Sequence, residues 1–261
     1  MNISSSFNTA NQLNKTQSDQ STHTQRISTG QRINSAKDDA AGLAISTRFD
    51  SQERSIQVAL RNSLDATSRT QVEGGALSSV TEDLQRIREL KVQQGNGVLN
   101  DQDKAAIQSE IDSRADNINL IFSDTQFNQK DVFEEGQLNF QTGADAGQTI
   151  DIDTVDMGQA FKDIGLKSSA EFSLEDIDKA LGQVVSRQSE LGAVENRLSS
   201  NAEFLQLKNE NNQVANSRIK DTNVAQAVSE KTKSDIMSQV QISVQAQSNS
   251  SSKYVLNLLE S

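Results

Sequence analysis

The stretch RINSAKDDAAGLAI, residues 32–45, contains two adjacent acids, a glycine and several alanines between polar surroundings. Ser35 precedes Asp38 by three residues, a capping-box spacing, and Asp38 and Asp39 stand where a helix N-terminus favours negative charge. The pattern predicts that a long helix begins here. Gly42 and the alanines would let neighbouring chains approach closely. We therefore interpret Ser35, Asp38, Asp39 and Gly42 as a joint between an N-terminal arm and a helical rod.

A catalytic interpretation of the two aspartates is disfavoured by the rest of the chain. Adjacent helical residues point about 100° apart, and no histidine or nucleophile accompanies the pair. His23 is the only histidine, so one chain cannot build a catalytic triad or a histidine-based metal site. DIDTVD, residues 151–156, lacks the glycine and the glutamate of a calcium loop. We expect no enzyme activity, no cofactor and no metal.

The arm before the joint is strongly polar. Of its first 25 residues, 17 are Ser, Thr, Asn or Gln, and the few apolar side chains cannot offset the entropy of ordering. We predict that this arm is disordered in the isolated chain and becomes helical on assembly. Gly30 stands where the C-terminus of such a helix would place it.

After the joint, a helical period predicts one helix of about 50 residues that ends at Gly95 and Gly97. A second helix should follow, capped by Asn100 or Asp101. The expected apolar positions of the first helix are Ile45, Phe49, Ile56, Leu60, Leu64, Val72, Ala76, Val80, Leu84 and Ile87. Those of the second are Ala106, Ile107, Ile111, Ile118 and Ile121.

After the second helix, the spacing of apolar residues changes from a helical period to a period of two. Leu138 and Phe140, and Ile150 and Ile152, alternate with polar residues on either side of GADAG, which predicts a half-buried β-hairpin.

Ser173 and Asp176 form another capping-box pattern, which opens a helix with a coiled-coil seam. KDTN, residues 220–223, interrupts it, and the last segment fits a helical stripe or, at residues 240–246, a strand. The seam positions are 177, 181, 184, 188, 191, 195, 198, 202 and 205, apolar except at Gln188 and Glu195.

These elements predict a mainly α fold: a long antiparallel helical rod, similar to a coiled-coil bundle, with a small β-hairpin and terminal arms that are helical on assembly. The predicted domains are an N-terminal arm (1–33), the joint (34–45), the N-terminal helices and hairpin of the rod (46–172), the C-terminal helix of the rod (173–220) and a C-terminal arm (221–261).

The charge of the chain restricts its partners. The net charge is −11, it is concentrated in the middle of the chain, and no basic patch is available to bind phosphates. We therefore expect no nucleic-acid partner and no membrane partner. No apolar run approaches about 18 residues, and the N-terminus has no signal-peptide pattern, so we predict neither a membrane span nor export by a cleavable signal.

Seven segments, in order, resemble bacterial flagellin: RINSAKDDAAGLAI, LQRIRELKVQ, TQFN, TIDID, LGAVENRL, NSRIKD and VLNLL. The resemblance implies a structural subunit that is exported by the flagellar type III route and polymerises into the extracellular filament for swimming. The arms would line the inner tube of the filament, and the central helices would form the next shell. Only about 20 residues, 157–173, stand where flagellins usually carry variable outer domains, so a minimal form is expected.

The resemblance also implies partners and contact residues. Arg86, Leu90 and Glu110 match positions that pack neighbouring subunits or contact a vertebrate Toll-like receptor. The expected partners are further copies of the chain, an export chaperone, the filament cap and the hook-filament junction proteins. Two alternatives stay open: a hook-filament junction protein, and a secreted ligand of a host receptor that does not polymerise. The residues expected to contact the chaperone or the inner tube are Val255, Leu256, Leu258 and Leu259.

Overall fold

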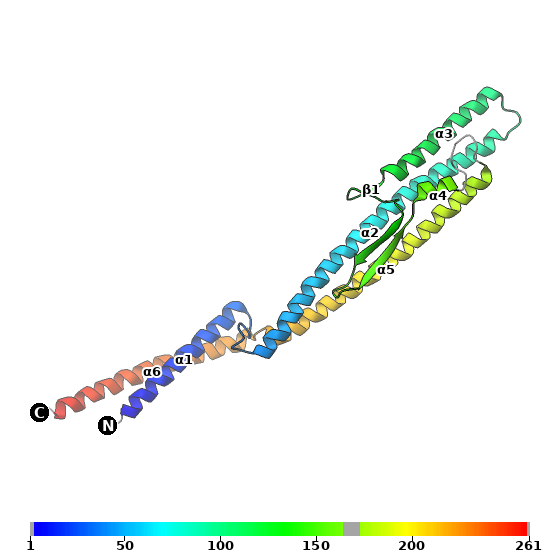
Figure 1. Cartoon of the computed structure of the whole chain (residues 1–261). Helices are drawn as coiled ribbons and strands as arrows, with labels where there is room; N and C mark the ends of the chain where they lie inside the picture. The colour runs from blue at the N-terminus through cyan, green and yellow to red at the C-terminus, as the bar shows by residue number, and fades with distance from the viewer. Residues whose placement is uncertain (1–2, 164–172, 260–261) are drawn as a thin grey trace. The chain divides into compact units, whose positions relative to one another are not determined.

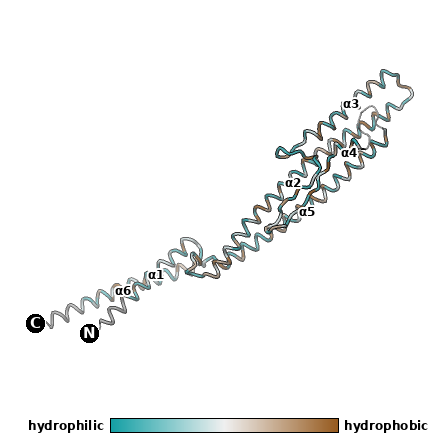
Figure 2. The backbone as a smooth tube through the Cα atoms, viewed as in Figure 1, coloured by the Kyte–Doolittle hydropathy of each residue, from teal (hydrophilic) through white to brown (hydrophobic). Residues whose placement is uncertain are grey.

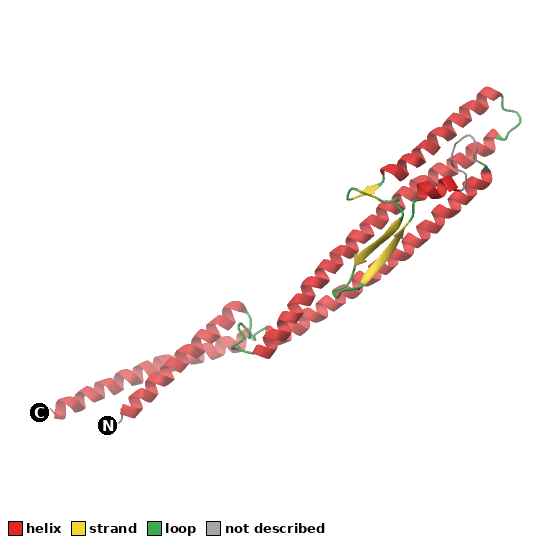
Figure 3. Cartoon of the chain, in the orientation of Figure 1, coloured by secondary structure: helices red, strands yellow, loops and turns green. Residues whose placement is uncertain are grey.

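The computed structural model describes the backbone of residues 3–163 and 173–259, and the side chains of residues 10–162 and 173–251. Long helices dominate the described chain, and the strands are short (Figure 3). The predicted mainly α fold with a small antiparallel hairpin is confirmed. In chain order the elements are α1 (Ile3–Thr29), α2 (Ala40–Gln94), α3 (Asp101–Asp124), β1 (Gln126–Phe127), β2 (Lys130–Asp131), β3 (Gly136–Gln141), β4 (Thr149–Thr154), α4 (Met157–Asp163), α5 (Leu174–Lys220) and α6 (Val224–Leu259).

Backbone contacts divide the chain into two compact units. The first consists of residues 1–52 and 211–261, and the second of residues 53–210. Both predicted arms and the joint lie in the first unit, together with the adjoining turns of α2 and α5.

In the first unit, α1 and α6 lie side by side and antiparallel (Figure 1). Gln20 Nε2 donates to Asp235 Oδ1 at 2.5 Å, and His23 Nδ1 lies 3.4 Å from Glu230 Oε2. Gly30, with a φ of +69°, ends α1 as predicted. The arm is helical in this structure because α6 supplies a partner along it. Its disorder in the isolated monomer stays a prediction.

The last segment is the helix α6, so the strand suggested by the alternation at residues 240–246 does not form. A helix satisfies its backbone groups internally, whereas a strand needs a neighbouring strand to pair with. Asn223 caps this helix, because its side chain accepts a hydrogen bond from Gln226 N at 3.2 Å. The alternating residues Val240, Ile242 and Val244 are all more than half exposed on α6.

The helix predicted after the joint is α2, which ends at Gln94 before Gly95 as expected. Its buried face is only partly the predicted one. Ile45, Leu64 and Val72 are exposed, and the positions buried as predicted are Ile56, Val80, Leu84 and Ile87. The inward positions are shifted by a residue or two over this part of the helix, because α5 and the hairpin both cover it. The buried side chains of α2 are Ser46, Ile56, Ala59, Ser63, Ala66, Arg69, Thr70, Glu73, Leu77, Val80, Asp83, Leu84, Ile87 and Leu90.

Asn100 caps α3 as predicted, accepting a hydrogen bond from Asp103 N at 2.8 Å. The hairpin is also confirmed, with Leu138 opposite Ile152 and Phe140 opposite Ile150.

Two small elements were not predicted. Strands β1 and β2 pair across Asn128 and Gln129, which both have positive φ, and α4 packs Phe161 edge-on against Phe122. The sequence lacks the glycine that usually marks such a turn, and α4 is too short for a helical period to be seen.

The predicted capping box at Ser173 is present, since Asp176 N donates to Ser173 Oγ at 3.1 Å and Ser173 N donates back to Asp176 Oδ2 at 3.3 Å. The seam of α5 is only partly as predicted. Ala180 and Arg187 are buried in addition to the predicted positions, and Leu181 is partly buried against the core, because α5 packs against more than one neighbour and needs a wider buried face than a coiled-coil seam. Its buried residues are Ile177, Ala180, Val184, Arg187, Leu191, Leu198 and Leu205.

Hydrophobic and hydrophilic residues are interspersed along the long helices α2 and α5 (Figure 2). Within the described ranges, no helix combines the length and the apolar character that crossing a bilayer would require.

Candidate functional site

The first half of the joint is a hydrogen-bonded turn before α2. Asp38 Oδ2 accepts from Asn34 N at 3.1 Å, and from Ser35 N and Ser35 Oγ at 3.0 Å each. Asp38 N in turn donates to Ser35 O at 3.0 Å. Only half of the predicted capping box forms, because Ser35 N donates to the Asp38 carboxylate but Asp38 N bonds to the backbone O of Ser35 and not to its hydroxyl. The prediction of a helix start at Ser35 is wrong, because residues 36–38 form a turn and α2 begins only at Ala40.

Asp39 is the residue that caps α2. Its Oδ1 accepts from Gly42 N at 2.8 Å, and its backbone O accepts from Leu43 N at 3.0 Å. A Cβ atom at position 42 would lie 2.6 Å from Ile33 Cδ1 and would also overlap the Asp39 carboxylate. Ile33 is only 1% exposed. Gly42 therefore allows a close approach within this chain, whereas the sequence suggested an approach between chains.

The joint and the end of α1 are hydrogen-bonded to the end of α5 and to the short segment that leads into α6. Arg32 N donates to Lys220 O at 2.6 Å, and Thr222 N donates to Gly30 O at 3.0 Å. Arg32 Nη2 also donates to Ile219 O at 2.7 Å. The chain passes from one arm to the rod at residues 30–32 and from the rod to the other arm at residues 219–222. Backbone hydrogen bonds hold these two crossings together. A change of conformation at one crossing has to be accommodated at the other.

The turn at Asp38 makes the joint sensitive to acid. The hydrogen bonds from Asn34 N and from the Ser35 hydroxyl and N–H lower the pKa of the Asp38 carboxyl below its ordinary value. Since the folded-state pKa is depressed, the stabilisation is complete above the unfolded pKa and is lost as the pH falls through the folded pKa.

We therefore expect the melting temperature of the first compact unit to fall between about pH 5 and about pH 3, and to fall less in Asp38→Asn. Thermal melts of both proteins at the two pH values measure this difference. Asp65→Asn, at an exposed carboxylate of the second unit, serves as the control and should behave like the wild type. An acid response that is equal in Asp38→Asn and in the wild type would rule out this role of the carboxylate.

Arg86 and Glu110 meet at an exposed face formed by α2 and α3. Arg86 Nε lies 3.0 Å from Glu110 Oε1, and the two side chains are 45% and 41% exposed. Leu90, predicted to share their contact, is 2% exposed and belongs to the hydrophobic core. The structure therefore brings together two of the three predicted residues, while Leu90 supports the face from beneath.

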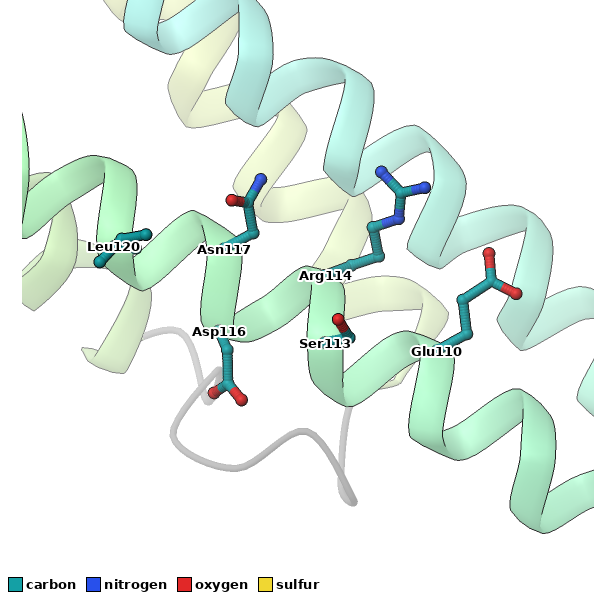
Figure 4. Close-up of a pocket in the computed structure, with 6 residues that line it drawn as sticks. All are labelled: Glu110, Ser113, Arg114, Asp116, Asn117 and Leu120. Atoms are coloured by element: carbon teal, nitrogen blue, oxygen red, sulfur yellow. The ribbon is translucent and has the colours of Figure 1, made fainter.

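The same face continues along α3 as a shallow open depression of about 650 Å³. Figure 4 shows Glu110 and Arg114 reaching toward α2 and Asp116 pointing away from it. Arg114 Nη1 and Asn117 Nδ2 both donate to the nearly buried carboxylate of Asp83 on α2. These bonds fix the register of α3 against α2 and so hold Glu110 beside Arg86.

A buried ionic cluster, which the sequence interpretation missed, lies between α2 and α5. Glu73 is 1% exposed and accepts from Arg69 Nη1 at 3.0 Å and from Arg187 Nε at 2.7 Å. Arg69 Nη2 donates to Val132 O, and Arg187 Nη2 donates to Asp153 O. Three charged side chains thereby join both rod helices to the hairpin and to the loop that follows β2.

The predicted chaperone residues Val255, Leu256, Leu258 and Leu259 belong to the last turns of α6, and their side chains lie outside the described part of the chain. Within the described part, no three His, Cys, Asp or Glu side chains are grouped so that they could hold a metal ion.

Comparison with known proteins gives consistent matches. The family model of the bacterial flagellin N-terminal helical region matches residues 2–137, and that of the bacterial flagellin C-terminal helical region matches residues 174–259. The flagellin of Bacillus subtilis is 35% identical over 97% of both chains, and that of Halalkalibacterium halodurans is 38% identical over 90% of both. A crystal structure of Bacillus cereus flagellin superposes with a TM-score of 0.50 at 25% identity, over 56% of this chain and 88% of that one.

Proposed function

The chain belongs to the bacterial flagellin family, and on this premise we propose how its surfaces serve filament assembly. It is a structural subunit and not an enzyme, and it polymerises with itself into the extracellular flagellar filament. The observation that carries this conclusion is the match of both helical regions of the family, in order, over most of the chain. The comparisons favour neither the junction protein nor the receptor ligand that does not polymerise.

We infer that the subunit leaves the cell through the flagellar type III channel and adds to the filament beneath a cap, for swimming. The polar arms support this proposal, because a segment that buries few apolar side chains stays unfolded until copies of the chain surround it. Only residues 155–173 separate the hairpin from α5, which supports a minimal form without outer domains. The first subunits of the filament would attach to a hook-filament junction protein.

The joint is proposed to couple the ordering of the arms to the rod. Its support is the bonding of Arg32 and Thr222 across the two crossings, together with the cap at Asp39. When the arms become ordered on assembly, both crossings would take up their final conformation together. The rod would then add to the filament in one orientation.

The apolar end of the chain is proposed as the segment that an export chaperone covers before secretion. Four of the five residues from position 255 to position 259 are Val or Leu. Covering them would suppress premature association of the subunits. In the filament the same residues would contact the inner tube.

Arg86 and Glu110 are proposed to pack neighbouring subunits and, in the free monomer, to contact a vertebrate Toll-like receptor. We expect Arg86→Ala to weaken receptor signalling by the monomer about tenfold, because an exposed arginine at the centre of a contact contributes strongly to binding. A reporter-cell assay of the monomer measures this. Arg88→Ala is a matched control, since Arg88 is a similarly exposed arginine on α2 that pairs with Asp178. Equal responses of the wild type and Arg86→Ala would remove the assignment.

The polymer itself is tested by seeding. Purified subunit is added to sheared filament fragments, and long particles are collected by sedimentation. The proposal expects most of the protein in the pellet, at a yield that rises with protein concentration. A chain that stays in the supernatant at every concentration would exclude the filament function.

A further inference from the structure

We propose that a stripe on α5 of one subunit docks into a groove beside the hairpin of the next, so that the second compact unit contacts its neighbour through two different surfaces. This inference rests on the filament function and names the contact that would build the polymer. The stripe consists of Arg197, Phe204, Leu207 and Lys208. The groove is formed by residues of α2, β1, β2 and β3 and by the loop before β3.

The groove combines an apolar floor with an acidic rim. It has a volume of about 980 Å³. Its rim includes the exposed carboxylates of Asp131, Glu134 and Glu135, none of which pairs with a basic side chain in the described part of the chain. Lys130 and Arg69 also line it, but Arg69 is buried and committed to Glu73. The half-buried floor residues are Phe127, Leu138 and Phe140.

The stripe has the complementary composition. Phe204 and Leu207 are 60% and 61% exposed, although the neighbouring Leu205 is buried. The i, i+3 spacing makes them one apolar patch on α5. Arg197 precedes Phe204 by two turns, and Lys208 follows it by one, so both lie along the same side of the helix. A large aromatic flanked by two cations fits an apolar floor with carboxylates at its rim.

The arrangement of the two surfaces suits an open polymer. No residue of α5 lines the groove, so the stripe and the groove are separate surfaces of one unit. A contact between two different surfaces leaves one of each free on every dimer, and repetition then extends a helical filament. A contact between two identical surfaces would instead close at the dimer.

Cross-linking tests this contact directly, because the natural chain contains no cysteine. We would polymerise the double variant Leu207→Cys with Gln137→Cys, which places one thiol in the stripe and one at the groove, and treat it with a short bismaleimide. The expected product is a ladder of dimers, trimers and longer species on a denaturing gel. A mixture of the two single variants should give dimers and nothing larger. The control pair Leu207→Cys with Asp116→Cys, on α3, should give no ladder.

Charge reversal provides a second test. Arg197→Glu with Lys208→Glu, and separately Glu134→Lys with Glu135→Lys, should each raise the critical concentration for polymerisation at least tenfold. Combining all four changes should restore it to within about threefold of the wild type. Circular dichroism shows whether each variant folds. The cross-linking test involves none of these charge reversals, so it still tests the contact if a reversed variant does not fold.

The results separate this contact from the filament function itself. Wild-type filaments without a ladder from the groove pair, or charge reversals that leave the critical concentration unchanged, would overturn the contact and leave the filament function intact. Absence of wild-type filaments would overturn the function.

Discussion

Replacing Glu73 by leucine is expected to lower the free energy of unfolding by about 3–5 kcal/mol, because two buried guanidinium groups would lose their shared counter-charge. Arg69 and Arg187 are 4% and 5% exposed, so solvent cannot replace the carboxylate. Arg69 keeps only the uncharged Val132 O, and Arg187 keeps the uncharged Asp153 O and the largely exposed carboxylate of Glu190. Urea unfolding followed by circular dichroism measures the change.

The matched control is Glu190→Gln, which also removes a partner of Arg187 but at a side chain that is 61% exposed. Its expected cost is below about 1 kcal/mol. Replacing the whole cluster, as Arg69→Met, Glu73→Leu and Arg187→Met, should be far milder than Glu73→Leu alone, because no uncompensated charge remains. If Glu73→Leu proves no more damaging than Glu190→Gln, the cluster does not hold the hairpin to the rod.

Replacing Gly42 by valine is expected to destabilise the first compact unit by about 1–3 kcal/mol through overpacking, and to abolish polymerisation. The added side chain would overlap Ile33 and the Asp39 carboxylate that caps α2. The second unit should stay folded, because its core contains none of these residues. Sedimentation reports polymerisation, and circular dichroism with limited proteolysis reports the fold of residues 53–210.

Gly182→Val is the control for this change. A Cβ atom at Gly182 meets nothing within 4 Å on the described part of the chain, and glycine is a poor helix former, so this variant should fold and polymerise like the wild type. Loss of the second unit in Gly42→Val would show that Gly42 belongs to the rod fold. Normal polymerisation of Gly42→Val would show that the joint tolerates a side chain.

The sequence predicted helices and caps well because these features depend on near neighbours. The helix ends at Gln94 and Lys220, the capping box at Ser173 and the alternation of each hairpin strand all follow from residues within a few positions of one another. Ser35 with Asp38 shows the limit of such reasoning. The spacing was correct, but only the structure shows that the carboxylate closes a turn while Asp39 caps the helix.

The buried cluster could not be predicted in the same way. Glu73 and Arg187 stand at core positions of α2 and α5, but their polarity favours an assignment to the surface, so the predicted stripes were placed one residue away. The partners are 114 residues apart in the chain and meet only when the two helices pair. The burial of Leu90 could not be predicted for a related reason, since a local motif does not show which of its residues point into the core.

We propose that arms which order on assembly, held by the joint, turn a folded rod into a filament subunit. Electron microscopy of the purified chain after depolymerisation and reassembly, with and without residues 1–30, tests it most directly. Filaments are expected from the full chain and none from the truncated one, and circular dichroism should show the helical core folded in both. Filaments from the truncated chain, or none from the full chain, would contradict it.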